Sequence, residues 1–173
     1  GYRYALDAAR LLDASGFEFK MLFAGPASEE ELAYFEDFRN QNMLQGRVKY
    51  LGVIKDAGTT LIPRSDVILL PSRTEGFPMS LLEGLRAGKA LLATCVGGIP
   101  ELLKDAENGF FVERDGGDIA DKASLLLGNS ELLRSFSDKS RKLYESGFRI
   151  EDVCERYREA YSRAFDAFKG RWQ

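Results

Sequence analysis

Short apolar runs alternate along this chain with segments in which apolar residues recur at helical spacing. The apolar runs that predict strands cover residues 19–24, 48–51, 67–70, 90–96 and 110–112. The segments that predict helices cover residues 1–12, 29–43, 78–87, 100–104, 119–127, 130–145 and 150–168. Strands that alternate with helices indicate βαβ units and a parallel sheet.

The predicted strands are mostly apolar and lack a strict alternation with polar residues, as expected for strands that helices cover on both faces. The pattern therefore predicts an α/β fold, with a doubly wound, Rossmann-like parallel sheet of five or six strands and a helical tail over about 129–173. Ligands of such sheets bind beyond the carboxyl ends of the strands. The residues that follow each strand are therefore the place to look for a site.

The last predicted helix carries a wide apolar stripe. Its members, at helical spacing, are Val153, Tyr157, Ala160, Tyr161, Ala164, Phe165 and Phe168. We expect this stripe to pack on the domain's own sheet. The alternative is that part of it packs on a partner domain outside this chain.

Composition narrows the classes of function. The 24 basic and 27 acidic residues give a net charge of −3, which does not favour nucleic-acid binding. The chain has no histidine, so no mechanism or zinc site can use one from this chain. Cys95 and Cys154 lie far apart, so we predict no metal site and a reducing, cytoplasmic location. No apolar run approaches the about 20 residues that cross a bilayer.

The chain begins at Gly1, within a segment that already has a helical pattern, and shows no signal peptide. A native chain seldom starts inside a helix. We therefore expect this sequence to be a domain of a longer protein. The alternative is a processed or tagged N-terminus.

Two predicted strand ends share a local design, with glycine, a bulky apolar residue and then proline. The two copies are residues 76–78 and residues 98–100. Proline suits the first position of a helix, and glycine lets a ligand approach the backbone. We expect free N–H groups at Met79, Ser80 and Leu81 to make an anion site at the start of the helix.

Two acids flank this helix start. Glu75 precedes the helix, and Glu83 lies about 7.5 Å along it from Pro78. A carboxylate accepts two hydrogen bonds at once and so suits a vicinal diol. Two diol acceptors on either side of an anion site match the sugar, diphosphate and ribose of a nucleotide sugar. A helix cap and an exposed helix face are the alternative interpretation of the same acids.

Residues 66–101, DVILLPSRTEGFPMSLLEGLRAGKALLATCVGGIPE, resemble the donor-binding signature of retaining glycosyltransferases of GT-B fold, family 4, known as glycosyl transferases group 1. The Glu-x7-Glu spacing, the EGFP turn and the distal GGIPE carry the resemblance, and Asn108-Gly109 matches as well. The likeness covers nearly the whole chain. It implies that residues 1–173 are the nucleotide-sugar donor-binding domain, the C-terminal half of such an enzyme. The N-terminal acceptor domain would then lie outside this chain.

The resemblance also implies roles for individual residues. Glu75 would be catalytic, binding hydroxyls of the transferred sugar near the reaction centre, and Glu83 would bind the ribose. Backbone groups would line the donor site at Gly76, Phe77, Pro78, Met79, Ser80 and Leu81. Gly52 and Val53 would border the nucleobase. The family's cations for the diphosphate would fall before Gly1, and no metal would be needed.

The implied reaction is transfer of a hexose, with retention, from a UDP- or GDP-linked donor to an acceptor. The resemblance suggests synthesis of a bacterial surface polysaccharide or glycolipid, with no cofactor and no nucleic-acid partner. The reaction would take place in the cytoplasm, with contact to the inner face of the membrane through the missing domain. We expect this chain alone to be inactive.

Two other classes share the predicted architecture. A GT-B sugar-nucleotide epimerase usually relies on other acids and on histidines. A non-catalytic doubly wound module, such as a receiver domain, needs an acidic cluster after its first strand, where this chain has Ala24-Gly25-Pro26. Fold alone does not separate these classes, but the pair Glu75 and Glu83 favours the transferase.

Overall fold

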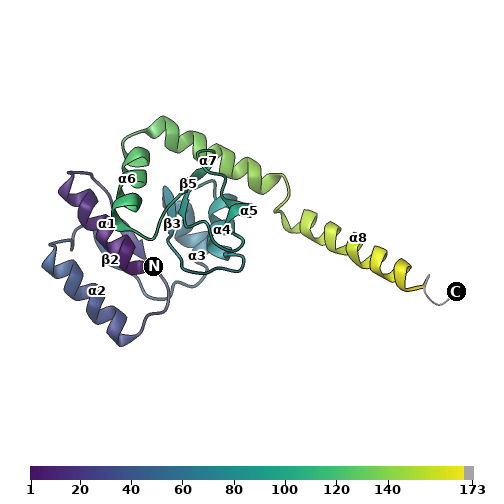
Figure 1. Cartoon of the computed structure of the whole chain (residues 1–173), viewed down its shortest axis with the longest axis horizontal. Coiled ribbons are helices and arrows are strands. Elements are labelled where there is room, and N and C mark those ends of the chain that lie inside the picture. The colour runs from purple at the N-terminus through teal and green to yellow at the C-terminus, as the bar shows by residue number, and fades with distance from the viewer. Residues whose placement is uncertain (170–173) are drawn as a thin grey trace.

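Five short parallel strands, flanked by helices, form the centre of the fold (Figure 1). The computed structural model describes residues 1–169. The strands are β1 (Met21–Phe23), β2 (Val48–Tyr50), β3 (Val67–Leu70), β4 (Ala90–Ala93) and β5 (Gly109–Phe111). Every strand pair is parallel, which confirms the predicted α/β class.

The strands form two sheets, so the prediction of one sheet with five or six strands is wrong. β1 pairs with β2, with Met21 opposite Val48. The second sheet has the order β3-β4-β5, with Val67 opposite Ala90 and Leu91 opposite Gly109. The apolar runs identify each strand correctly, but a run does not say which strand lies beside it. Within residues 1–169, β1 and β3 are not hydrogen-bonded to each other.

All seven predicted helices are present, and two short elements were missed. The helices are α1 (Tyr2–Ala14), α2 (Glu29–Gln41), α3 (Ala57–Thr60), α4 (Met79–Arg86), α5 (Ile99–Leu102), α6 (Gly116–Leu127), α7 (Ser130–Glu145) and α8 (Ile150–Lys169), with a 3-10 turn η1 (Ile62–Arg64). α3 and η1 are too short to show a helical period. α6 begins three residues earlier than predicted because the Asp115 carboxylate caps it, accepting a hydrogen bond from the Asp118 N–H at 2.9 Å.

Helix α1 packs over both sheets. Its Leu6 and Ala9 belong to the buried cluster that includes Val48 of β2 and the half-buried Met21 and Phe23 of β1. On the other side of the helix, Ala8 and Leu12 join the cluster of Ala90 and Leu92 from β4. A third buried cluster lies under α4. The helices thus hold the two sheets next to each other in one domain.

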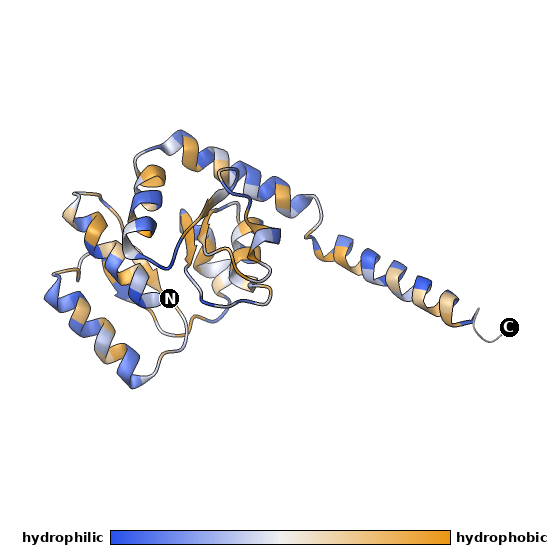
Figure 2. Ribbon diagram, viewed as in Figure 1, coloured by the Kyte–Doolittle hydropathy of each residue, from blue (hydrophilic) through white to orange (hydrophobic). Residues whose placement is uncertain are grey.

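Helix α8 extends away from the rest of the fold, and no residue of its described length is buried (Figures 1 and 2). Its aromatic stripe is more than half exposed at Tyr157 (62%), Tyr161 (72%), Phe165 (58%) and Phe168 (62%). The expectation that the stripe packs on the domain's own sheet is therefore wrong. Its first two turns, with Ile150, Val153 and Arg156, line a hollow beside the domain.

Across residues 1–169, none of the helices combines the length and the apolar character that crossing a bilayer requires.

Candidate functional site

The loops that follow β3 and β4 pack directly on each other. The Gly98 N–H donates to the Gly76 carbonyl oxygen at 2.7 Å, and the Thr94 hydroxyl donates to the Ser72 carbonyl oxygen at 2.7 Å. Gly97 has a φ of 54°, and a β-carbon there would collide with the Glu75 carbonyl oxygen. The glycine is therefore needed for both its conformation and its close approach. This contact fixes the loop that carries Glu75 against the end of β4.

Glu75 is half-buried in this loop. The Ser72 hydroxyl donates to Glu75 Oε1 at 2.7 Å, which orients the carboxylate. Glu75 Oε2 accepts no hydrogen bond from any residue in 1–169. The carboxylate thus has a free acceptor oxygen held in a defined position.

Helix α4 begins just after this loop. Pro78 is its N-cap, one residue before the position predicted for it, and no side chain caps the helix. The Leu81 N–H donates to the Pro78 carbonyl oxygen at 3.2 Å, so the expectation of a free N–H at Leu81 is wrong. The N–H groups of Met79 and Ser80 have no partner among residues 1–169. Two unpaired donors at a helix start attract an anion.

Glu83 lies one turn further along α4 and reaches a different neighbour. A β-carbon placed on Gly58 of α3 would come within 2.5 Å of the Glu83 carboxylate, so the carboxylate lies against this glycine. Arg86 also reaches the same residue, donating from Nη2 to the Gly58 carbonyl oxygen at 3.0 Å. α3 begins four residues after Val53, which is 73% exposed beyond the end of β2. Glu83 therefore lies beside the segment that follows the predicted nucleobase residues.

Gly52, the other predicted nucleobase residue, ends the β2 segment with a φ of 69°. Its carbonyl oxygen accepts a hydrogen bond from the Gly25 N–H at 2.9 Å. A hydrogen bond therefore joins the loops that follow β1 and β2, beyond the carboxyl ends of these strands. The loops that follow β3 and β4 are joined in the same way.

A hollow of about 530 Å³ adjoins α4 and the start of α8. Three predicted site residues, Phe77, Met79 and Glu83, line it. Glu75, Gly52 and Val53 do not. Tyr144 and Phe148 also line the hollow, and the Phe148 ring stacks on that of Phe77 with centroids 6.3 Å apart. Sequence reasoning missed these two aromatics, because nothing in a helical pattern shows that the end of α7 reaches α4.

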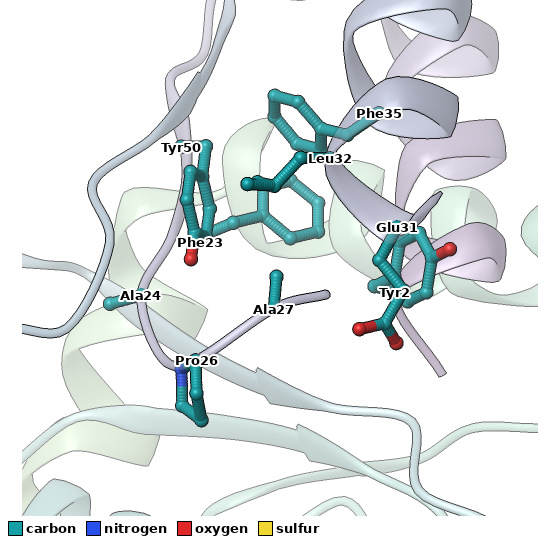
Figure 3. Close-up of a pocket in the computed structure, with 9 residues that line it drawn as sticks. All are labelled: Tyr2, Phe23, Ala24, Pro26, Ala27, Glu31, Leu32, Phe35 and Tyr50. Atoms are coloured by element: carbon teal, nitrogen blue, oxygen red, sulfur yellow. The ribbon is translucent and has the colours of Figure 1, made fainter. Parts of the chain in front are cut away.

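A smaller hollow, of about 140 Å³, lies beyond the carboxyl end of β1 (Figure 3). The rings of Phe23, Phe35 and Tyr50 surround it. The Phe23 and Phe35 rings meet edge to face, with their centroids 5.2 Å apart. The Tyr50 hydroxyl donates to the Gly25 carbonyl oxygen at 2.7 Å. None of the predicted site residues lines this hollow, and no sequence motif pointed to it.

Within residues 1–169, His, Cys, Asp and Glu side chains nowhere gather in a group of three that could hold a metal ion. Cys95 and Cys154 are both exposed and free.

The sequence matches the family described as glycosyl transferases group 1 over residues 1–143. The chain belongs to this family. Group 1 membership agrees with the resemblance of residues 66–101 to the same family.

Among characterised relatives, the N-acetyl-alpha-D-glucosaminyl L-malate synthase of Bacillus anthracis is 34% identical over 119 residues. The alignment covers 68% of this chain and 31% of the synthase. An uncharacterized glycosyltransferase of Methanocaldococcus jannaschii is 27% identical over 168 residues, which cover 96% of this chain and 45% of the relative. The chain thus spans less than half the length of these group 1 relatives.

Solved structures agree on the fold. The C-terminal domain of a glycosyl transferase group 1 family protein from Francisella tularensis has a TM-score of 0.78 and 25% identity, covering 87% of this chain and 80% of that domain. The Anabaena protein Alr3699/HepE, in complex with UDP, has a TM-score of 0.83 and 20% identity, covering 94% of this chain and 45% of that protein. The same protein has also been solved in complex with UDP-glucose. The group 1 chain therefore has the fold of a GT-B glycosyltransferase domain.

Proposed function

We propose that this chain is the donor-binding half of a retaining glycosyltransferase that transfers a hexose from a nucleoside-diphosphate sugar. One observation carries the proposal. Glu75 and Glu83 lie on either side of a helix start whose Met79 and Ser80 N–H groups have no partner among residues 1–169. Acceptors for two diols and donors for an anion are thus arranged along one segment, in the order that a nucleotide sugar requires.

Glu83 binds the ribose in this proposal. Its carboxylate lies against Gly58, in the helix that begins four residues after Val53. A ribose joins the nucleobase to the diphosphate, so its acceptor must lie between the residues for those two groups. The positions of Glu83, Val53 and the α4 start support that order.

Glu75 binds hydroxyls of the transferred sugar and is the proposed catalytic residue. Its carboxylate is half-buried and oriented by Ser72, with Oε2 left to accept from a ligand. The backbone of residues 76–78 lies between Glu75 and α4 and would line the sugar pocket. Met79, Ser80 and Leu81 would border the diphosphate. Leu81 would do so without donating its N–H, because that group is already paired with the Pro78 carbonyl oxygen.

The donor is UDP- or GDP-linked, with Gly52 and Val53 near the base. The Anabaena structures, which hold UDP and UDP-glucose, support a nucleotide-sugar donor and make UDP the first nucleotide to test. Retention and freedom from metal rest on the resemblance of residues 66–101. The same resemblance suggests an acceptor in bacterial surface polysaccharide or glycolipid synthesis.

A second, acceptor-binding domain of the same protein completes the enzyme in this proposal. The chain aligns with only 31% and 45% of the length of the two relatives above, which supports a longer protein. The exposed stripe of α8, with Tyr157, Tyr161 and Phe165, is a surface that such a domain could cover. The exposed free thiols of Cys95 and Cys154 suit the cytoplasm, and contact with the inner face of the membrane would come through the second domain.

The proposal is tested by titrating the chain with UDP, UDP-glucose, GDP and GDP-mannose in a calorimeter. We expect at least one nucleotide family to bind at one site, and competition between the free diphosphate and its sugar. Adenosine and inorganic phosphate serve as controls for binding to the base or the anion site alone. A chain that binds none of the four at millimolar concentration would contradict the proposal.

A further inference from the structure

Gly58 is a buried glycine at the second position of the short helix α3. It does not have a positive φ, unlike Gly52 and Gly97, so its backbone conformation does not require a glycine. Glycine is also less favourable inside a helix than any other residue except proline. The reason for a glycine at this position therefore lies in what surrounds it.

The neighbour that needs the space is the Glu83 carboxylate. A β-carbon on Gly58 would lie 2.5 Å from Glu83 Cδ, 2.5 Å from Oε1 and 2.9 Å from Oε2, and these are the three atoms nearest to it. Atoms that are not bonded do not approach so closely. The carboxylate thus occupies the space that a side chain at residue 58 would take. Because the two residues belong to different helices, this fit comes from how α3 and α4 pack.

The carboxylate of Glu83 is half-buried, yet it accepts no hydrogen bond from any residue in 1–169. Arg86 follows it by three residues on α4, a spacing at which acids and bases often pair. Arg86 Nη2 instead donates to the Gly58 carbonyl oxygen at 3.0 Å. Neither Glu83 nor Arg86 forms an ion pair in the described part of the chain. The arginine therefore ties α3 to α4 and leaves both carboxylate oxygens of Glu83 for a ligand.

We propose that Gly58 is a positioning residue for the donor site, and that Arg86 holds it in place. The missing side chain of Gly58 lets the Glu83 carboxylate lie against α3, where its two oxygens accept hydrogen bonds from the two hydroxyls of a ribose. A side chain at residue 58 would move the carboxylate out of that position. The inference rests on the ribose role proposed above for Glu83, and it adds the residue that fixes where the ribose is held.

Gly58→Ala separates this positioning role from a structural one. The atoms in the way are the end of a flexible side chain, and the hollow that Glu83 also lines gives the carboxylate room to move aside. Alanine also favours the helical conformation of α3. We therefore expect Gly58→Ala to unfold in urea at the midpoint of the parent or above it, and still to bind nucleotide less tightly. A glycine needed only for packing would instead lower the midpoint when replaced.

A double-mutant cycle tests whether Gly58 acts through Glu83. UDP and GDP are titrated into the labelled parent, Gly58→Ala, Glu83→Ala and the double variant, and dissociation constants are read from saturating amide shifts. For the nucleotide that the parent binds more tightly, we expect Gly58→Ala to weaken binding about fivefold or more. In the chain with Glu83→Ala, the same change should weaken binding by less than about twofold, because the displaced carboxylate is gone.

Gly46→Ala is the matched control for the cycle, because a β-carbon there meets no atom within 4 Å. It should leave the dissociation constant unchanged. The 2′-deoxy form of the same nucleotide gives a second readout, since it lacks one of the two hydroxyls assigned to Glu83. The parent should prefer the ribonucleotide about fivefold or more, and Gly58→Ala should reduce that preference to less than about twofold.

Three results would overturn the inference and leave the proposed function standing. They are unchanged nucleotide affinity in Gly58→Ala, an equal loss of affinity with and without the Glu83 carboxylate, and a retained preference for the ribonucleotide in Gly58→Ala. Failure of Gly58→Ala to fold would also overturn it, since the inference requires the carboxylate to move aside. A parent chain that binds neither UDP nor GDP would instead overturn the proposed function and this inference together.

Discussion

Glu75 and Glu83 are eight residues apart and contact different parts of the domain. Ser72 orients Glu75 within the loop after β3, while Glu83 lies against Gly58 of α3. Because the two carboxylates have different neighbours, we expect them to bind different parts of the donor. A carboxylate near the loop can meet the sugar, and one near α3 can meet the ribose. Two substitutions test this division.

Replacing Glu83 with alanine should weaken binding of the free nucleoside diphosphate. A hydrogen bond to a charged acceptor contributes about 1.5–3 kcal/mol, which corresponds to a loss of roughly tenfold to hundredfold in affinity. Calorimetric titration with UDP and GDP measures the loss, with Glu107→Ala as the matched control, because Glu107 is an exposed acid before β5 that lines neither hollow. An unchanged dissociation constant in Glu83→Ala would refute the ribose role.

Replacing Glu75 with alanine should act on turnover instead. The nucleoside-diphosphate affinity should stay within about threefold of the parent, because the nucleotide contacts lie on α4 and after β2. Turnover in the complete enzyme should fall by about a hundredfold or more, as for loss of a group that acts in the transition state. Steady-state kinetics with the native donor measure kcat and KM separately. Equal losses of nucleotide affinity in Glu75→Ala and Glu83→Ala would contradict the division of labour.

At this scale the sequence predicts residue types but not their partners. The acids, the glycines and the proline before α4 were all found from their spacing. The hydrogen bond from Ser72 to Glu75 was not predicted, because it depends on how the loop folds back. The N–H of Leu81 was expected to be free, yet a tight first turn pairs it with Pro78.

Helix α4 approaches the second sheet closely at Gly84. A β-carbon on Gly84 would lie 3.0 Å from Ile68 Cγ1 and 3.1 Å from Leu91 Cδ2. Alanine would gain up to about 1 kcal/mol in helix propensity, but overpacking a core costs about 1–3 kcal/mol. Since both neighbours are held in strands, we expect Gly84→Ala to lower the free energy of unfolding by about 1 kcal/mol.

Urea unfolding measures this change. Gly46→Ala is the matched control, because a β-carbon on Gly46 meets no atom within 4 Å. The control should leave the free energy of unfolding within about 0.5 kcal/mol of the parent. A more stable Gly84→Ala chain would mean that propensity, and not packing, decides at this position.

Among the elements, helices were easier to predict than sheets. Ser130–Glu145 of α7 has the predicted bounds, because its amphipathic period runs from an Asn129 cap to the turn before α8. The predicted strands 19–24 and 90–96 are longer than β1 and β4, because the apolar runs continue past the last ladder bond. The prediction that the apolar stripe of α8 packs on the domain's own sheet was wrong. A helical period shows that a face is apolar, but not what covers it.

In the whole molecule, the candidate site is exposed to solvent at the carboxyl ends of the strands. Glu75, Met79 and Ser80 lie at the carboxyl ends of the strands, and the α8 stripe is exposed beside the domain. Transfer chemistry needs water to be excluded by closure of a second wall. We therefore expect the chain alone to bind nucleotide weakly and to transfer no sugar.

This prediction is measured with labelled nucleotide sugars and candidate acceptors, first with the chain alone and then after adding the separately produced acceptor domain. Transfer should appear only in the second mixture. EDTA should not change nucleotide binding, because the family resemblance implies a metal-independent site. Sugar transfer by the chain alone would show that it holds a complete active site.

The central claim is that a nucleotide sugar binds between Glu75 and Glu83 at the start of α4. Mapping by NMR tests it most directly, with the labelled chain titrated with UDP-glucose and, separately, GDP-mannose. The account predicts the largest amide shifts at residues 75–83 and 52–58, including the Met79 and Ser80 amides, with saturation at a single dissociation constant. Saturating shifts confined to other parts of the chain, such as the aromatic hollow around Phe35, would contradict it.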